Sequence, residues 1–198
     1  MEEKFDGQQE GERVLYVVAP HPIAKQIAIA RIIFLSVFFF IVLWVIGTIV
    51  PVAAGMLQLI GFLLSVLLLI IGIWWNLTVY KKAKTYITDR RIIRFDVVSP
   101  FFMTKRALFW NEALKAKAYA PNLLYRTMKI GTIDVEPQLA EGEDVRVTDV
   151  YYFEDLANYI DKILFTFKNS PGEIATMKPF VPKGKGQRDE LTGSKESV

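Results

Sequence analysis

The chain has 198 residues, a small net charge of +3, 52% hydrophobic residues, no cysteine and one histidine. Without cysteine there is neither a thiol nucleophile nor a thiolate ligand for zinc, and one histidine gives the serines little support for a catalytic triad. The apolar residues gather in one block, whereas a soluble domain of this length would spread them among polar ones.

Residues 1–26 are predicted to be a polar segment followed by a lead-in. The first twelve residues, "MEEKFDGQQEGE", are polar and expected to be loose, and "RVLYVVAPHP" is a short β-like run broken by two prolines. His21 stands between these prolines. We interpret it as a polar residue near a membrane interface rather than as a ligand or a pH switch.

Residues 27–80 are predicted to be a hairpin of two transmembrane helices. No charged residue occurs from Ile32 to Tyr80, and one span needs roughly 20 apolar residues. The block suits two spans, 32–52 and 56–80, with "PVAAG" as the turn. A cleaved signal peptide is disfavoured by the length of the block and the long, charge-mixed segment before it. A buried hairpin of a soluble protein is disfavoured because the remaining chain is too small to cover it.

Basic residues flank the outer ends of both spans and are absent from the turn between them. Lys25 and Arg31 precede the first span, and a cluster of lysines follows the second. The positive-inside rule therefore predicts an inner-membrane protein with both termini in the cytoplasm. Aromatic rings and lysines at the end of the second span are expected to anchor it at the headgroups. The predicted anchoring residues are Trp74, Trp75, Lys81, Lys82 and Lys84.

The spans carry no charge, which disfavours a proton relay or an ion carrier. Gly61 and Ser65 form a pair of small residues four positions apart. Such a pair is expected to let the two helices pack closely.

Residues 81–167 are predicted to form one compact cytoplasmic α+β domain. "KTYIT" and "RRIIRFDVV" favour a tight hairpin that turns at Asp89 and Arg90, and "SPFFM" is a turn or loop. Further strands are expected in "TKRALFW", "ALKAKAYA", "IGTIDVE" and "VRVTDVY", and "PNLLYRTMK" fits a loop or a single helical turn.

The last element of the domain is a helix in 153–167, "FEDLANYIDKILFTF". Its apolar residues recur at i, i+3, i+4 and i+7 spacing, which is typical of a helix that covers a sheet. Strands followed by one amphipathic helix predict a small antiparallel barrel or sandwich closed by that helix. Residues 168–198 are rich in Pro, Gly, Lys and Ser and are predicted to be a disordered tail.

The order of these motifs resembles the membrane-anchored bacterial pleckstrin-homology-like (PH-like) proteins. "YITDRRII", Tyr86 to Ile93, matches the strand-turn-strand that opens the family's domain, and "GTIDV", Gly131 to Val135, matches a later motif. The resemblance covers about residues 12–167. It implies an antiparallel half-barrel of seven strands capped by a C-terminal helix. It also implies binding of headgroups, peptides or protein surfaces, with no catalysis and no cofactor.

The resemblance also points to the first hairpin and the neighbouring strand as a binding surface for phosphate or an acidic partner. The candidate residues are Arg90, Arg91, Arg94, Lys105 and Arg106. Guanidinium groups suit such a site because they offer paired hydrogen bonds. The alternative is that Arg91 has a structural role and that the others form a solvated face near anionic lipid.

Two functions remain open at this point. The chain is predicted to be a binding or scaffold module at the inner leaflet, which recruits a protein partner or contacts anionic lipid. The alternative is a structural subunit that forms a homo-oligomeric membrane assembly. A lipid-directed enzyme would need an acid–base pair that the sequence does not display. The acidic residues between Asp134 and Asp149 fit no EF-hand spacing, and a lipid surface explains the basic residues more simply than nucleic acid does.

Overall fold

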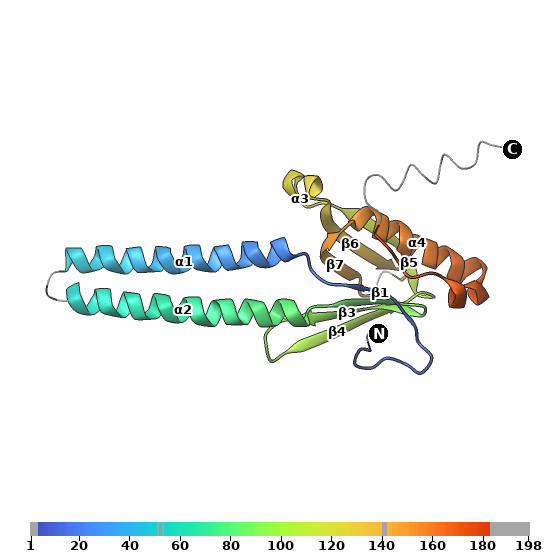
Figure 1. Ribbon diagram of the computed structural model, residues 1–198, viewed down its shortest axis with the longest axis horizontal. Coiled ribbons are helices and arrows are strands. Elements are labelled where there is room, and N and C mark those ends of the chain that lie inside the picture. Colours follow the sequence, from blue (N-terminus) through green and yellow to red (C-terminus); the bar gives the residue numbers. More distant parts are fainter. Residues whose placement is uncertain (1–3, 51, 53, 140–141, 183–198) are drawn as a thin grey trace. The chain divides into compact units, whose positions relative to one another are not determined.

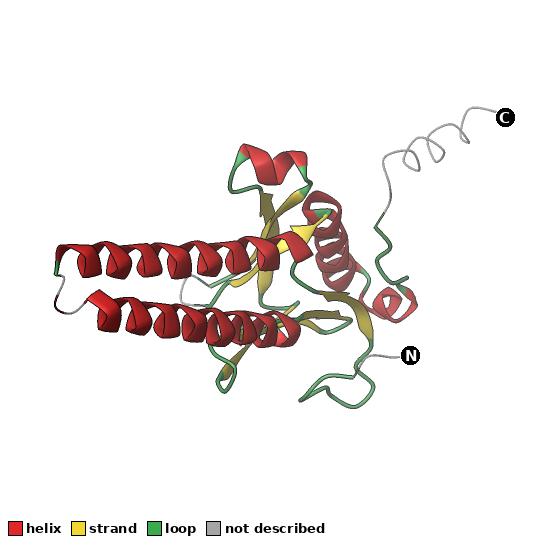
Figure 2. Cartoon of the chain, turned by 60° about the vertical axis from the view of Figure 1, so that its left-hand side comes forward, coloured by secondary structure: helices red, strands yellow, loops and turns green. Residues whose placement is uncertain are grey.

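The fold is given by a computed structural model that describes residues 4–50, 52, 54–139 and 142–182. The chain divides into two compact units. The helical unit contains residues 19–84 and 95–105, and the β unit contains the described residues of 1–18, 85–94 and 106–198. Figures 1 and 2 show two long helices, a set of strands and a C-terminal helix. The chain passes repeatedly between the two units, in place of the continuous segments 27–80 and 81–167 expected from the sequence.

The helical unit is built on α1 (Pro22–Ile49) and α2 (Ala54–Lys82). Both predicted spans are helical, and each helix extends beyond its apolar block at the outer end. His21 explains where α1 begins, because its Nδ1 accepts a hydrogen bond from the Ile23 N–H at 3.2 Å. Pro22 follows at the first helical position, where its missing N–H costs nothing. His21 is therefore the N-cap of α1.

Small residues line the contact between α1 and α2. Ser36 Oγ donates to the Ser65 carbonyl at 2.8 Å, and Ser65 Oγ donates back to the Ser36 carbonyl at 3.2 Å. A Cβ atom on Gly61 would lie 3.0 Å from Leu43 Cβ. Close packing at Gly61 and Ser65, predicted from their spacing, is confirmed by this geometry and by their burial.

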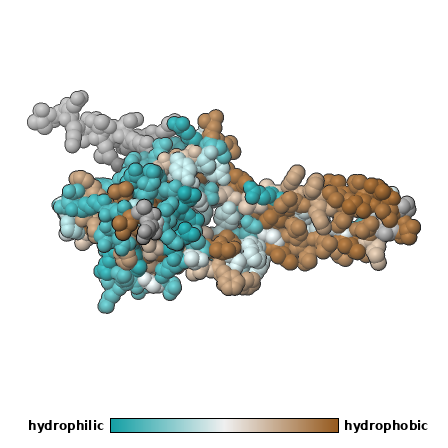
Figure 3. Space-filling model, turned by 180° about the vertical axis from the view of Figure 1, so that it is seen from behind, coloured by the Kyte–Doolittle hydropathy of each residue, from teal (hydrophilic) through white to brown (hydrophobic). Residues whose placement is uncertain are grey.

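Most of the apolar surface of α1 and α2 is uncovered. Only 11% of the most apolar window of each helix is buried, and both helices are long and apolar enough to cross a membrane. Figure 3 shows this surface as a nearly continuous brown area. The core helix of a soluble protein would hide such side chains from water.

The strands form two antiparallel sheets. The four-stranded sheet has the order β1-β2-β3-β4, with β1 (Val14–Val18), β2 (Thr85–Thr88), β3 (Arg91–Val97) and β4 (Met103–Phe109). The three-stranded sheet has the order β5-β6-β7, with β5 (Ala113–Tyr119), β6 (Ile130–Pro137) and β7 (Val145–Tyr151). The hairpin predicted at Asp89 and Arg90 is confirmed, since Ile87 pairs with Ile92.

Strand β1 pairs with β2 although the two helices separate them in the sequence. Val18 lies opposite Thr85, and Val14 lies opposite Thr88. The β-like run assigned to the lead-in is therefore part of the domain. A fragment that begins near residue 81 would lack a strand of its own sheet.

Helix α4 (Phe153–Asn169) supplies one side of the core of the β unit, as its apolar spacing predicted. Leu156, Ile160 and Ile163 are at most 1% exposed, whereas Phe165 is 69% exposed. Trp110 is fully buried in the same core and donates its indole N–H to the Thr88 carbonyl at 2.9 Å. A short helix, α3 (Leu123–Thr127), lies in the segment expected to be a loop or a single helical turn.

The Phe153 ring, at the start of α4, leaves no room for a side chain at position 131. A Cβ atom there would lie 2.5 to 2.7 Å from ring atoms of Phe153, which is buried in the core. The motif glycine of β6 therefore makes room for the aromatic ring that closes the domain.

The segment after α4 is ordered as far as the described residues reach. It forms a 3₁₀ helix, η2 (Pro171–Thr176), in which Ile174 is 5% exposed. Met177 and Phe180 pack against the core, and Arg13 Nη2 donates to the carbonyls of Ile174 and Met177 at 3.0 and 2.9 Å. The prediction of disorder from residue 168 is wrong for this stretch, because apolar residues three positions apart bury themselves despite the Pro, Gly and Lys around them. Residues 183–198 lie outside the described chain.

Candidate membrane-contact and binding site

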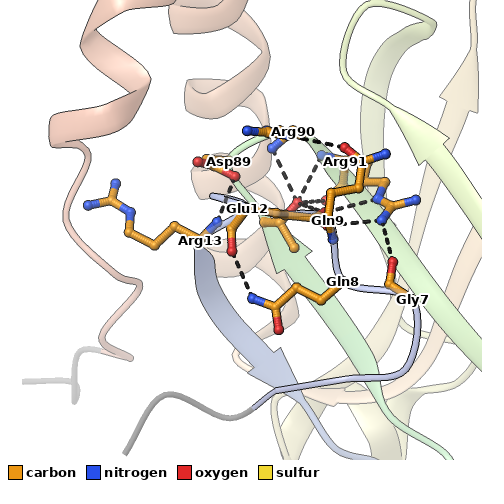
Figure 4. A network of polar contacts seen from close by, with 9 residues as sticks. Gly7, Gln8, Gln9, Glu12, Arg13, Asp89, Arg90 and Arg91 are labelled. Carbon is orange, nitrogen blue, oxygen red and sulfur yellow. Dashed lines mark hydrogen bonds and ion pairs between the residues drawn. The ribbon is translucent and has the colours of Figure 1, made fainter.

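A buried ion pair joins the N-terminal segment to the first hairpin (Figure 4). Arg91 Nη2 lies 2.9 Å from Glu12 Oε2, and Arg91 Nε lies 2.9 Å from Glu12 Oε1. The side chain of Glu12 is fully buried and that of Arg91 is 10% exposed. This is the bidentate geometry that strengthens an arginine–carboxylate pair. The N-terminal residues expected to be loose are thus held by a specific contact.

Several further hydrogen bonds complete this network. The Gln9 N–H donates to Glu12 Oε2 at 2.8 Å, and the Thr88 hydroxyl lies 2.9 Å from Glu12 Oε1. Arg13 and Asp89 add a reciprocal pair, because each backbone N–H donates to the other residue at 3.0 Å. The network therefore satisfies the buried carboxylate from three directions.

The network also sets the charge state of Glu12. Burial raises the pKa of the Glu12 carboxyl, but the hydrogen bonds from Arg91, Gln9 and Thr88 and the charge of Arg91 outweigh burial. The pKa of Glu12 consequently lies below its ordinary value. The hydrogen bond from Glu12 raises the pKa of Arg91 against the opposing effect of burial.

Arg91 therefore has a structural partner within the chain, and its guanidinium is buried against Glu12. Its neighbour Arg90 is exposed, and Arg90 Nη1 donates to Gln9 Oε1 at 3.1 Å. Arg94 is half-buried in β3, opposite Thr85 of β2. Arg90 lies in the turn and Arg91 opens β3, so the two consecutive arginines have different surroundings.

Lys105 and Arg106 fall in different units. Lys105 belongs to the helical unit, is exposed, and places its Nζ 5.4 Å from the centroid of the Phe95 ring. Arg106 belongs to the β unit, and its Nε lies 4.0 Å from Glu143 Oε2 with both side chains largely exposed. The five candidate residues therefore occupy several environments, and Arg91 is the one whose charge is buried.

The predicted anchoring residues lie at the end of α2. The side chains of Trp74 and Trp75 are 49% and 39% exposed. Lys81 and Lys82 are exposed in the last turn, and Lys84 is half-buried just beyond it. An aromatic pair followed by lysines is the order expected where a helix passes from hydrocarbon to headgroups.

Two of the acidic residues considered for calcium, Asp134 and Glu136, are paired with basic side chains. Arg146 Nε lies 2.8 Å from Asp134 Oδ1. Glu136 contacts both Lys117 and Lys115, and the hydrogen bond from Lys117 lowers the pKa of Glu136. Within the described ranges, no group of three or more His, Cys, Asp or Glu is placed to hold a metal ion.

A groove of about 720 Å³ runs along α4 of the β unit, beside the segment that follows it. It is lined by Asp155, Asn158, Tyr159, Lys162, Thr166, Glu173, Thr176, Met177, Lys178, Pro179, Phe180 and Val181. The Tyr159 hydroxyl donates to the Lys178 carbonyl at 2.7 Å. Burial raises the pKa of Tyr159 to about 12, and the charge of Arg13 acts weakly against it. The tyrosine therefore stays protonated, and its hydrogen bond joins α4 to the segment around Lys178.

Comparisons with known proteins give no further assignment. No known family matches the chain, and no significant match is found among curated proteins or solved structures.

Proposed function

We propose that the chain is an integral membrane protein in which α1 and α2 span the inner membrane and hold a cytoplasmic binding domain. The observation that carries this proposal is the uncovered apolar surface of the two helices, of which only 11% is buried in the most apolar windows. Lipid is the solvent that makes such a surface favourable. All backbone hydrogen bonds of a helix are also satisfied within it, as a membrane requires.

The orientation follows from charge. Lys25 and Arg31 lie toward the start of α1, and Lys81 and Lys82 end α2, so basic residues mark the outer ends of both helices. The positive-inside rule assigns these ends to the cytoplasm. Each exposed lysine near an anionic leaflet adds about 1 kcal/mol of attraction.

The domain is proposed to act as a PH-like binding and scaffold module rather than as an enzyme. The motif around Arg91 and Gly131 supports the family resemblance, and the PH-like half-barrel itself is part of the proposal. The groove along α4 offers polar and apolar side chains to a protein segment. Arg90, Arg94, Lys105 and Arg106 are proposed to provide a general attraction to anionic lipid, with Arg91 withdrawn into its ion pair.

The topology is tested with single cysteines, because the chain has none of its own. In intact cells, a cysteine at Ala54 is expected to react with an impermeant thiol reagent from outside. A cysteine at Glu154, on the exposed start of α4, is expected to react only after the membrane is opened. The opposite labelling pattern would invert the orientation, and protection of both sites would contradict a hairpin.

The lipid role is tested with the full chain in nanodiscs that contain phosphatidylglycerol, cardiolipin or phosphatidic acid at matched charge. We expect lipid co-purified from the three discs to be equal per charge and to fall smoothly with salt, as a diffuse attraction does. Lys105→Ala should change it no more than Arg90→Ala, which removes one exposed charge of the same proposed set. A preference for one headgroup that only Lys105→Ala removes would assign a specific lipid site instead.

A further inference from the structure

The turn between β3 and β4 exposes large apolar side chains. We call residues 98–103, which are this turn and the first residue of β4, the apolar turn. Its Phe101 and Phe102 are 75% and 73% exposed. Val98 is 72% exposed and Met103 is 51% exposed. Turns ordinarily carry Gly, Pro, Asn, Asp or Ser, and a cluster of exposed apolar side chains marks an interaction site.

The apolar turn is held in a defined shape by its own hydrogen bonds. Ser99 Oγ accepts from the N–H groups of Phe101 and Phe102 at 3.3 and 3.1 Å. The Ser99 N–H donates to the Phe102 carbonyl at 3.2 Å, and the Phe102 N–H donates to the Ser99 carbonyl at 3.3 Å. Pro100 stiffens the backbone between them. The two rings are therefore presented from a closed loop rather than from a loose one.

The apolar turn belongs to the helical unit and contacts α2 directly. The Phe101 and Trp74 ring centroids are 6.2 Å apart, and Lys82 Nζ donates to the Pro100 carbonyl at 2.7 Å. Trp74 precedes Lys82 by two helical turns, or about 12 Å along the axis. Phe101 thus contacts α2 at Trp74, about two turns before Lys82 near the end of the helix.

We propose that the apolar turn inserts into the boundary between headgroups and hydrocarbon, in the leaflet where α2 ends. The lipid bilayer is the occupant because the exposed rings continue the lipid-facing surface of α2 at Trp74. Lys82 and the exposed Lys105 supply positive charge for lipid phosphates beside the rings. The inference rests on the proposed membrane-spanning role of α2. It adds a third membrane contact, which belongs to the β3–β4 hairpin itself.

The test uses the full chain in phosphatidylcholine–phosphatidylglycerol vesicles, with an environment-sensitive fluorophore on single cysteines. Phe101→Cys and Phe102→Cys labels are expected to be quenched by lipids with a nitroxide at carbon 5, and less by lipids with it at carbon 12. The Leu67→Cys label, in the middle of α2, should show the reverse order. The Phe165→Cys label, at an equally exposed phenylalanine of the β unit, should not be quenched.

The outcomes separate the two proposals. Quenching at Leu67 without quenching at Phe101 and Phe102 overturns the insertion of the apolar turn and keeps the spanning role. No quenching at Leu67 overturns the spanning role itself. Equal quenching at Phe165 contradicts a contact specific to the turn. In the Phe102→Cys protein, a second change of Phe101→Asp should lower the quenching, whereas Phe101→Leu should retain it.

Discussion

Leu156→Asp is expected to unfold the β unit while leaving the helical hairpin intact. Leu156 is 1% exposed and packs in the core with Trp110 and Val135. A carboxylate placed there would lose its hydration without gaining a partner, at a cost of several kcal/mol. That cost approaches the whole stability of a typical domain, about 5–15 kcal/mol. In detergent micelles, hydrogen exchange of β6 and α4 should lose its protection, and limited proteolysis should release fragments from the β unit alone.

Phe165→Asp is the matched control, because Phe165 lies on the same helix and is 69% exposed. Its exchange pattern should equal that of the natural chain. Asp161 is a poorer control, although it also faces outward, since its Oδ1 accepts a hydrogen bond from the Ala116 N–H at 3.0 Å. If Leu156→Asp and Phe165→Asp were tolerated alike, the apolar face of α4 would not form the core.

Glu12→Gln is expected to lower the free energy of unfolding of the β unit by about 3–5 kcal/mol, the usual cost of removing one partner of a buried ion pair. The change leaves the guanidinium of Arg91 buried without its counter-charge. Glu10→Gln is the control, because Glu10 is exposed in the same segment. Pulse proteolysis in increasing denaturant measures the difference between the two variants.

The double change Glu12→Met with Arg91→Leu separates charge from packing. Apolar replacements of both partners of a buried pair are often neutral or stabilising. We therefore expect the double variant to recover most of the stability lost in Glu12→Gln. A double variant as unstable as the single one would mean that the shape of the pair, rather than its charge balance, holds the N-terminal segment.

The same ion pair predicts acid sensitivity. The pKa of Glu12 is lower in the folded chain than in the unfolded one. The stability that the carboxylate contributes is therefore fully present above its unfolded pKa of about 4.3 and is lost as the pH falls through the folded value. Glu12→Gln should remove this part of the acid dependence, so that the two proteins differ less at low pH than at neutral pH. An unchanged difference would contradict ionisation of Glu12 as its source.

Local patterns predicted most elements of the fold. The uncharged block predicted both helices of the hairpin. Asp89 and Arg90 predicted the β2–β3 turn, and the apolar stripe from Phe153 predicted α4. Each of these signals is local, because a single span, the turn and the apolar stripe are each one continuous run of residues. Side-chain periodicity and turn chemistry are decided at that range.

The features that the sequence did not reveal depend on contacts between distant residues. Glu12 and Arg91 are 79 positions apart, and a glutamate in a polar segment resembles any solvated charge until its partner is known. For this reason the sequence alone leaves Arg91 open between a ligand-binding role and a structural one. Strand β1 and the segment around Ile174 fall in the predicted lead-in and tail because their partners are distant in the sequence. Strand β1 pairs with β2 beyond both helices, and the Ile174 carbonyl accepts from Arg13, 161 positions away.

Some of the candidate membrane contacts can be predicted from local sequence, and others depend on contacts between distant residues. The tryptophans and lysines at the end of α2 stand out because they follow the apolar block directly. Phe101 and Phe102 are visible in the sequence only as two aromatic residues beside a proline in a turn. Their proposed role in membrane contact depends on the contact of Phe101 with Trp74. The one sequence signal for this contact is that the turn is apolar, whereas turns are usually polar.

The pairing of β1 with β2 also determines when the first sheet can form during synthesis. A ribosome releases β1 first, then both helices, and only afterwards the strand that β1 needs, since Val18 pairs with Thr85. The first sheet therefore stays open during synthesis until the whole helical hairpin has emerged. The Glu12 carboxylate likewise stays hydrated until Arg91 has been synthesised. A delay in the emergence of the second helix would therefore leave β1 unpaired and Glu12 without its counter-charge for longer.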